Sequence, residues 1–312
     1  MRKVSFSRFG GVEVLEMIDE PVPAIDDHGV LVQVKAVSIN PVDWKIRQGE
    51  MKLMSGRRFP KGVGIDFSGI VARTGSSASR FHVGQAVFGA LDPFKGGAMA
   101  EYVAAGQDAL ALKPESISFE QAAALPVAGC AALQVFDTLD VLRHGKDILI
   151  NGAGGGIGMF AAQIARARGA VVTGVGSSRA LPLLRRWGCD HVISYESGSV
   201  LSSMRQYDAV IDLSGRMPFG LASAFMKRRS VYVNVIPGPR QIVGSFFHNL
   251  HASKKSRVLL SKNSSSDLAT LAQLADGGME IVVGRTYPLE AFKQAYQEVP
   301  RRGFAGKAVV VI

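Results

Sequence analysis

The spacing of apolar and polar residues changes along the chain, and this change divides it into parts with different predicted elements. Residues 30–38, Val-Leu-Val-Gln-Val-Lys-Ala-Val-Ser, alternate in places and are rich in β-branched side chains, which is typical of a strand. Similar short segments follow at residues 69–72 and 85–88, with glycine and proline between them. This pattern predicts an irregular antiparallel sheet or partial barrel over roughly the first 120 residues.

Helical patterns begin near Ser118, where Ser118 and Gln121 have the spacing of a capping box and an alanine-rich stretch follows. Farther along, apolar runs alternate with helical stretches. Strands are predicted at 147–151, 170–175, 191–194, 207–213, 230–236 and 281–286, and helices at 159–168, 181–187, 267–275 and 289–297. Strands separated by helices predict a parallel, doubly wound sheet, and the apolar run 307–312 predicts a buried closing strand.

The turn between the strand 147–151 and the next helix is rich in glycine. Ala153, Gly155 and Gly158 occupy the three positions of a dinucleotide fingerprint, here in the form AxGxxG. Such a site needs glycine because the backbone turns sharply and approaches a pyrophosphate without an intervening Cβ. We therefore predict nucleotide binding by Ala153, Gly155, Gly156, Ile157 and Gly158; a glycine-rich turn without a ligand is the alternative.

The choice of nucleotide depends on the residues after the strand 170–175. NAD sites place an acid there to hold the ribose 2′-hydroxyl, but this chain has Ser177, Ser178 and Arg179, and no acid before Asp190. Hydroxyl groups and a guanidinium suit a 2′-phosphate, so the sequence favours NADPH over NADH. An ordinary surface arginine is the alternative for Arg179, and Tyr195 is expected near the adenine.

Composition limits the class of protein. The 312 residues, 47% of them hydrophobic, are enough for two domains with sizeable cores. The net charge of +10 favours anionic ligands, but the basic residues are dispersed, so a solvated surface is expected and no specific nucleic-acid partner. The two cysteines exclude a disulfide framework. Because no signal pattern and no apolar stretch of about 20 residues occurs, a soluble, cytoplasmic protein without a membrane span is expected.

Several segments together resemble the medium-chain dehydrogenase/reductases. They are Ser-Ile-Asn-Pro-Val-Asp-Trp-Lys at 38–45, Gly-Ile-Asp-Phe-Ser-Gly at 64–69, Gly-Ala-Met-Ala-Glu-Tyr at 97–102, Ala-Ala-Leu-Pro-Val-Ala-Gly at 123–129 and the glycine-rich turn. The likeness is to the zinc-free quinone oxidoreductase branch. Within it, residues 40–45 and Val-Ile-Pro-Gly-Pro at 235–239 are similar to the chloroplast-envelope type and related enone reductases.

The resemblance implies an α/β fold of two domains and a homodimer. A GroES-like, β-rich catalytic domain would comprise residues 1–123 and 263–312, and a Rossmann domain with a doubly wound parallel sheet would comprise residues 124–262. It also implies where metal ligands stand in zinc-dependent relatives. Those positions here hold Ile65, Val127 and a turn at 40–43 without cysteine, so no metal is expected.

The resemblance also implies candidate site residues. Asn40 is the leading polar group near the nicotinamide and the substrate oxygen, although Asn-Pro-Val-Asp also has the pattern of a helix N-cap. Trp44, Phe246 and Phe247 are candidate walls of an apolar substrate pocket, with core packing as the alternative for each. Another group is expected on the nicotinamide side: Gly129, Ala131, Pro237 and Gly238.

These features predict NADPH-dependent hydride transfer to a quinone or an α,β-unsaturated carbonyl compound. Without a metal, no Lewis acid polarises a simple ketone, whereas conjugated acceptors spread the new charge onto an oxygen. Two alternatives remain open. One is an enoyl-thioester reductase, and the other is a weakly catalytic NADPH-binding protein that acts through nucleic-acid or membrane contacts.

Overall fold

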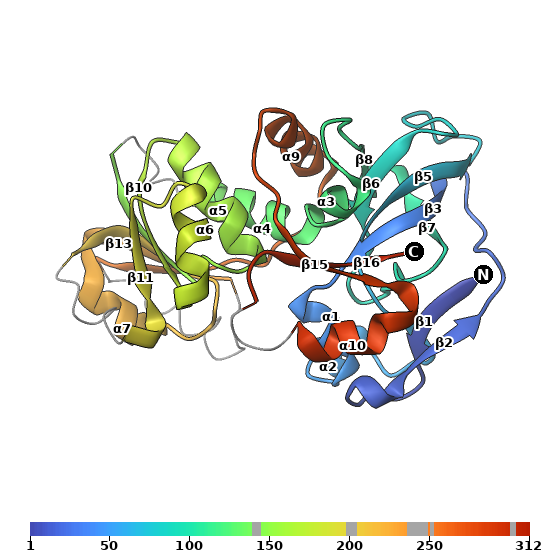
Figure 1. Cartoon of the computed structure of the whole chain (residues 1–312), viewed down its shortest axis with the longest axis horizontal. Helices are drawn as coiled ribbons and strands as arrows, with labels where there is room; N and C mark the ends of the chain where they lie inside the picture. The colour runs from blue at the N-terminus through green and yellow to red at the C-terminus, as the bar shows by residue number, and fades with distance from the viewer. Residues whose placement is uncertain (139–144, 198–204, 236–248, 250–252, 300–303) are drawn as a thin grey trace. The chain divides into compact units, whose positions relative to one another are not determined.

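The computed structural model describes residues 1–138, 145–197, 205–235, 249, 253–299 and 304–312 (Figure 1). The chain divides into two compact units. Unit 1 comprises Met1–Val127 and Asn263–Ile312, and unit 2 comprises Ala128–Lys262. The sequence placed the first boundary slightly earlier, after residue 123, and the second at the same place, after residue 262.

Unit 1 is built on a sheet in which most neighbours are antiparallel. Its strands are, in order, β15 (Val283–Pro288), β16 (Lys307–Val311), β3 (Gly29–Ser38), β5 (Asp66–Thr74), β6 (Ala86–Ala90) and β8 (Leu110–Leu112), with β7 (Tyr102–Gly106) paired to β3. A smaller sheet has the order β2 (Leu15–Asp19), β1 (Arg2–Phe6) and β4 (Lys61–Gly62). Because β3 has neighbours on both sides and is buried along most of its length, its sequence is largely apolar rather than strictly alternating.

Short helices surround these sheets. They are α1 (Pro41–Arg47), α2 (Lys52–Ser55), α3 (Phe119–Ala123), α9 (Ser265–Asp276) and α10 (Phe292–Glu298), with the 3-10 turns η1 (Val12–Val14), η2 (Gln107–Ala109) and η6 (Leu289–Ala291). The predicted capping box at α3 is confirmed, because Ser118 Oγ accepts from Gln121 N at 3.2 Å and Gln121 Oε1 accepts from Ser118 N at 3.0 Å. Ala123 packs with Ala36 of β3 and Val309 of β16, which attaches this helix to the sheet.

Unit 2 contains the predicted parallel sheet. Its strands are, in order, β11 (His191–Ser194), β10 (Val171–Gly176), β9 (Asp147–Asn151), β12 (Tyr207–Asp212), β13 (Met226–Asn234) and β14 (Lys255–Val258). All five pairings are parallel, and the order is that of a Rossmann fold. The direction of chain progression reverses between β9 and β12. Ligands of such sheets bind at the carboxyl ends of the strands near this point.

Helices α5 (Gly156–Ala167), α6 (Leu181–Arg186) and α7 (Phe219–Ala222) pack on the parallel sheet. Helix α4 (Pro126–Thr138) precedes β9, and the 3-10 turns are η3 (Ser178–Ala180), η4 (Tyr195–Ser197) and η5 (Ser223–Phe225). Helix α5 contacts β9 and β10, and α6 contacts β10 and β11, so the two helices lie on one face of the sheet (Figure 1). Among the described residues, no helix is both long and apolar enough to cross a bilayer.

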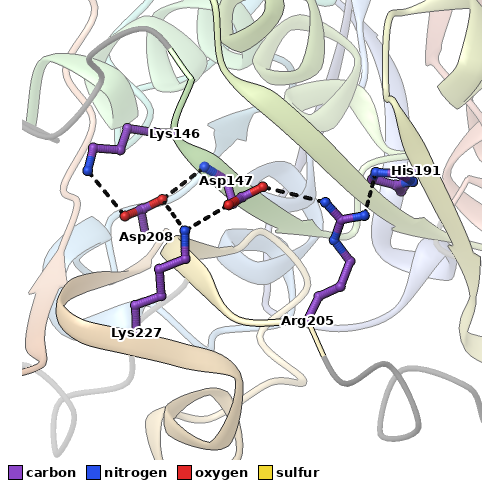
Figure 2. Close-up of polar contacts among 6 residues, drawn as sticks. All are labelled: Lys146, Asp147, His191, Arg205, Asp208 and Lys227. Atoms are coloured by element: carbon purple, nitrogen blue, oxygen red, sulfur yellow. Dashed lines mark hydrogen bonds and ion pairs between the residues drawn. The ribbon is translucent and has the colours of Figure 1, made fainter.

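A cluster of ion pairs joins the amino ends of β9, β12 and β13 (Figure 2). Asp208 accepts hydrogen bonds from Lys227 Nζ at 2.8 Å, from the Asp147 amide at 3.0 Å and from Lys146 Nζ at 3.3 Å. Lys227 Nζ also bonds Asp147 Oδ2 at 2.7 Å. Partial burial alone would raise the pKa of Asp208, but the hydrogen bonds from Lys227, Asp147 and Lys146 lower it below its usual value.

We expect Asp208→Asn to reduce the free energy of unfolding by about 1–2 kcal/mol at pH 7, since hydrogen bonds between charged groups are lost. The pKa of Asp208 is lowered by folding, so its contribution is present above the unfolded pKa. The difference between variant and wild type should therefore shrink as the pH falls below about 4. Urea unfolding at several pH values measures this.

Asp137→Asn provides the matched control, because Asp137 pairs with Arg168 at 3.1 Å but its side chain is 60% exposed, against 14% for Asp208. An exposed pair of this kind contributes under about 0.5 kcal/mol. Equal losses in the two variants would contradict a stabilising role for the partly buried cluster.

Candidate functional site

The glycine-rich turn connects the end of β9 to the start of α5. Gly152 has a φ of +86°, which favours glycine, and its amide and that of Ala153 donate to the Val175 carbonyl of β10 at 3.1 and 2.9 Å. Gly155 N then donates to Gly152 O at 3.1 Å and closes the turn. The turn is therefore held by the carboxyl ends of two neighbouring strands.

The start of α5 presents partly exposed backbone. Gly155, Gly156 and Ile157 are partly exposed, whereas Ala153 and Gly158 are buried. The first amides of an α-helix have no acceptor within the helix, and the aligned peptide dipoles give this end a partial positive charge. Together with the turn, these groups suit the pyrophosphate of a dinucleotide.

Gly155 and Gly158 are glycine for different reasons. A Cβ on Gly158 would lie 2.4 Å from the Ala153 carbonyl oxygen and 2.5 Å from its Cα, so the helix approaches the turn too closely for any side chain. A Cβ on Gly155 would meet nothing closer than Gly152 O at 3.5 Å. The protein's own packing requires glycine at 158, but it leaves space beside 155.

The carboxyl end of β12 supports this turn through Asp212. Its buried carboxylate accepts from Asn151 Nδ2 at 3.0 Å, from the Ser214 amide at 3.0 Å and from the Met217 amide at 3.0 Å. The loop after β12 is thereby fixed beside the turn, and a Cβ on Gly152 would lie 3.3 Å from Ser214 Cβ. The sequence reasoning missed Asp212, although an acid at the end of a predicted buried strand was a usable signal.

The predicted 2′-phosphate corner forms at the ends of β10 and β11. Gly176 and Ser194 are paired in the sheet, so the residues that follow them, Ser177 and Tyr195, reach the same edge. Ser177 is buried, whereas Ser178, Arg179 and Tyr195 are exposed. The corner adjoins the glycine-rich turn, since a Cβ on Gly154 would lie 2.8 Å from Ala180 Cβ.

An acid that the sequence reasoning did not include also lies at this corner. Glu196 Oε2 accepts a hydrogen bond from the Ser178 amide at 3.1 Å. Hydrogen bonds from Ser178 are the main cause of the lowered pKa of Glu196, and the charge of Arg179 lowers it further. Glu196 follows Asp190 in the sequence, and β11, which lies between them, returns the chain to the corner.

For the other predicted site residues, the structure gives a position in the fold without a contact that bears on the predicted role, or no description. Gly129 and Ala131 lie buried on α4, and their position on the nicotinamide side stays a prediction. Trp44 lies on α1, partly buried against the core of unit 1, as its core-packing alternative requires. The remaining predicted residues fall outside the described part of the chain: Pro237, Gly238, Phe246 and Phe247.

Asn40 begins α1, as the N-cap pattern predicted. Its backbone is extended, Pro41 occupies the first helical position, and Asp43 Oδ2 accepts from the Asn40 amide at 2.8 Å. Tyr296 OH, from α10, donates to the same oxygen at 3.3 Å, while Asp43 Oδ1 has no partner among the described atoms. Burial raises the pKa of Asp43 to about 7, against the hydrogen bond from Asn40, which lowers it.

The side chain of Asn40 is held between two buried charges. Lys307 Nζ donates to Asn40 Oδ1 at 2.6 Å, and Asn40 Nδ2 donates to Asp66 Oδ2 at 2.8 Å. An ammonium only donates and a carboxylate only accepts, so the two contacts determine the orientation of the amide. Burial lowers the pKa of Lys307 and raises that of Asp66, and the opposite charge of each partly offsets this effect.

Asp66 brings together the segments where zinc-dependent relatives are expected to hold metal ligands. Its Oδ2 accepts from Asn40, in the turn 40–43, and its Oδ1 accepts from the Val127 amide at 3.1 Å. Ile65 directly precedes it in the chain. Within the residues that the structure describes, no group of three histidine, cysteine or acidic side chains is placed to hold a metal ion.

Comparisons with known proteins agree with this architecture. The family described as alcohol dehydrogenase GroES-like domain matches residues 26–115, and the family described as zinc-binding dehydrogenase matches residues 187–310. A chloroplastic quinone-oxidoreductase from Triphysaria versicolor is 30% identical over 99% of this chain and 98% of its own. A mitochondrial NAD(P)H oxidoreductase from Homo sapiens is 31% identical over 97% of this chain and 87% of its own.

Solved structures show the same fold. The quinone oxidoreductase from Coxiella burnetii superimposes with a TM-score of 0.90 at 30% identity, covering 100% of this chain and 99% of that one. The chain therefore belongs to the medium-chain dehydrogenase/reductase superfamily, as the sequence motifs indicated. Within that superfamily, the relatives named here include quinone oxidoreductases.

The two glycines of the turn should respond differently to substitution. We expect Gly155→Ala to leave the unfolding temperature within about 1 °C of wild type but to weaken dinucleotide binding at least tenfold, because the added methyl occupies the anion's space. Gly158→Ala should cost about 3 kcal/mol or more of stability, because backbone must move. Thermal unfolding and calorimetric titration measure the two effects. Equal effects of the two substitutions on stability and on binding would contradict the assignment of Gly155 to the dinucleotide site and of Gly158 to packing.

Asp43 should make stability depend on pH. Its pKa of about 7 in the folded protein exceeds the ordinary 3.8, so between these values the folded state retains a proton that the unfolded chain releases. Its contribution is therefore full at low pH and is lost as the pH rises through 7. Relative to wild type, we expect Asp43→Asn to gain stability between pH 5 and 7, by at most about 1.4 kcal/mol per pH unit.

Urea unfolding of both proteins at pH 5, 6, 7 and 8 measures this difference. Asp19→Asn is the control, because Asp19 is an exposed acid at the end of β2. A difference between Asp43→Asn and wild type that does not vary with pH would show that the carboxyl titrates at its ordinary value.

Proposed function

We propose that this chain is an NADPH-dependent oxidoreductase that transfers a hydride to a quinone or an α,β-unsaturated carbonyl compound without zinc. The observation that carries the proposal is the glycine-rich turn at the carboxyl end of β9. Its partly exposed residues begin a helix at the reversal point of a Rossmann sheet, and the first amides of a helix have no acceptor within it, so they suit an anion. Unit 2 would bind the dinucleotide, and unit 1 would supply the polar group, Asn40.

Support for a nicotinamide dinucleotide comes from the turn and from the relatives. The human relative is named an NAD(P)H oxidoreductase, and this name allows either reduced cofactor. The preference for NADPH rests on the exposed Arg179 and Ser178, whose guanidinium and hydroxyl groups suit a 2′-phosphate. It also rests on the sequence at the end of β10, where Ser177 replaces the acid typical of NAD sites.

Support for a reaction without zinc comes from the residues around Asp66. The expected ligand positions hold Ile65 and Val127, which have no donor side chains. The side chain of Asn40 is engaged by Lys307 and Asp66, and the buried Lys307 ammonium would repel a second cation. These residues do not fit a zinc ion, so the proposal contains no step through a metal.

The acceptor class follows from what the remaining groups can do. Bound NADPH supplies a hydride, and a quinone or enone takes up that electron pair while negative charge develops on its oxygen. Asn40 Nδ2 carries two hydrogens; Asp66 accepts one, and the other, on a residue that is 2% exposed, is the proposed donor to that oxygen. A proton from water then completes the hydroquinone or the saturated carbonyl compound. Lys307 and Asp66 would keep the Asn40 amide in the donating orientation.

The proposal predicts NADPH oxidation, measured as loss of absorbance at 340 nm, when a 1,4-naphthoquinone or 3-buten-2-one is added to purified protein. Gly155→Ala should lose this activity while remaining folded. In the same preparation, metal analysis should find less than one zinc ion per chain, and a chelator should leave the rate unchanged. A panel of quinones and enones without turnover above background would overturn the enzymatic proposal. Stoichiometric zinc with loss of activity on chelation would overturn its zinc-free part.

A further inference from the structure

Glu196 places a negative charge at the corner where the proposed function expects the negatively charged 2′-phosphate of NADPH. Its carboxylate accepts a hydrogen bond from the Ser178 amide, with an N–O distance of 3.1 Å, and Ser178 belongs to the corner assigned to the 2′-phosphate. Glu196 is exposed, as are Ser178 and Arg179, so the interaction lies on the surface that a nucleotide would approach. The corner already binds an anion supplied by the chain itself.

The backbone of Glu196 is positioned independently of this contact. Ser194 Oγ accepts from the Glu196 amide at 3.2 Å and shares a hydrogen bond with Ser178 Oγ at 2.9 Å. Ser197 Oγ donates to the Ser194 carbonyl at 2.8 Å. These bonds tie η4 to the end of β11, so the backbone of Glu196 is held beside the corner by bonds other than the contact of its carboxylate with Ser178.

We propose that Glu196 is a specificity-determining residue, whose carboxylate competes with the 2′-phosphate of NADPH and so reduces the preference of the site for NADPH over NADH. This inference rests on the proposed function, since it assumes that a nicotinamide dinucleotide binds to unit 2. A phosphate that accepts a hydrogen bond from the Ser178 amide must either displace the Glu196 carboxylate or bind beside this carboxylate. Displacement would cost the carboxylate its hydrogen bond from Ser178, and a phosphate beside the carboxylate would be repelled by the like charge.

The competition would weaken the binding of NADPH but not that of NADH. NADH has a ribose 2′-hydroxyl in place of the phosphate, and a hydroxyl can donate a hydrogen bond to a carboxylate. Glu196 therefore offers an acid to the 2′-position although β10 itself ends without one. Arg179 has the opposite effect, because its guanidinium attracts the 2′-phosphate of NADPH. NADH has no 2′-phosphate, so Arg179 would not strengthen its binding in this way. Arg179 and Glu196 together would set the ratio of the two affinities.

Glu196→Gln tests the proposal with little change in shape. Glutamine keeps an oxygen that can accept the Ser178 proton, and the bonds to Ser194 involve only the backbone of residue 196. We expect the dissociation constant for NADPH to fall about five- to tenfold at low ionic strength, with less improvement in high salt. The constant for NADH should stay the same or rise by up to about threefold.

Calorimetric titration of wild type, Glu196→Gln, Arg179→Ala and Asp137→Asn with both cofactors separates the possibilities. Asp137→Asn makes the same change in net charge away from the corner, so NADPH binding should not change. Equal shifts for NADPH and NADH in Glu196→Gln, weaker NADPH binding, or no shift would each overturn the competition. By contrast, wild type that binds neither cofactor would contradict the proposed function itself, and Arg179→Ala that leaves NADPH binding unchanged would contradict its preference for NADPH.

Discussion

The close approach of α5 to the end of β9 is the constraint on which the candidate site depends. With only a hydrogen at Gly158, the helix backbone lies against Ala153, and the amides that follow Gly155 are brought to the carboxyl edge of the sheet. Asp212 then holds the loop after β12 against the same turn. A wider helix–strand spacing would leave these donors in other places, and no single side chain could replace them.

Unit 1 depends on a different constraint, the cost of burying charge. Lys307 and Asp66 come from distant parts of the chain, and each needs partners because an isolated buried charge is strongly unfavourable. Asn40 bridges the two, while Ser38 and the Val127 amide complete the hydrogen bonds to Asp66. The polar group proposed to act on substrate is thus oriented by the same bonds that make this core possible.

The sequence predicted most of the strands of unit 2, the α3 capping box and the N-cap at Asn40, because periodicity and caps are local signals. It did not predict β14, whose Lys-Ser-Arg-Val sequence has no apolar run, since an edge strand need not be apolar. Lys307 as a partner of Asn40, and Glu196 as a neighbour of Ser178, could not be predicted from spacing. Those contacts follow from strand order and register, which short motifs do not encode.

Charged and polar groups are arranged differently at the two edges of the parallel sheet. At the amino edge, Lys227, Asp147 and Asp208 satisfy one another, so little unpaired charge remains for a ligand (Figure 2). At the carboxyl edge, the turn before α5 brings backbone amides whose partners the helix cannot supply. A parallel sheet separates these roles because every helix starts at the same edge. Like the buried Asp212, Glu196 brings a carboxylate to this edge, but Glu196 is exposed and lies beside the donors of the corner.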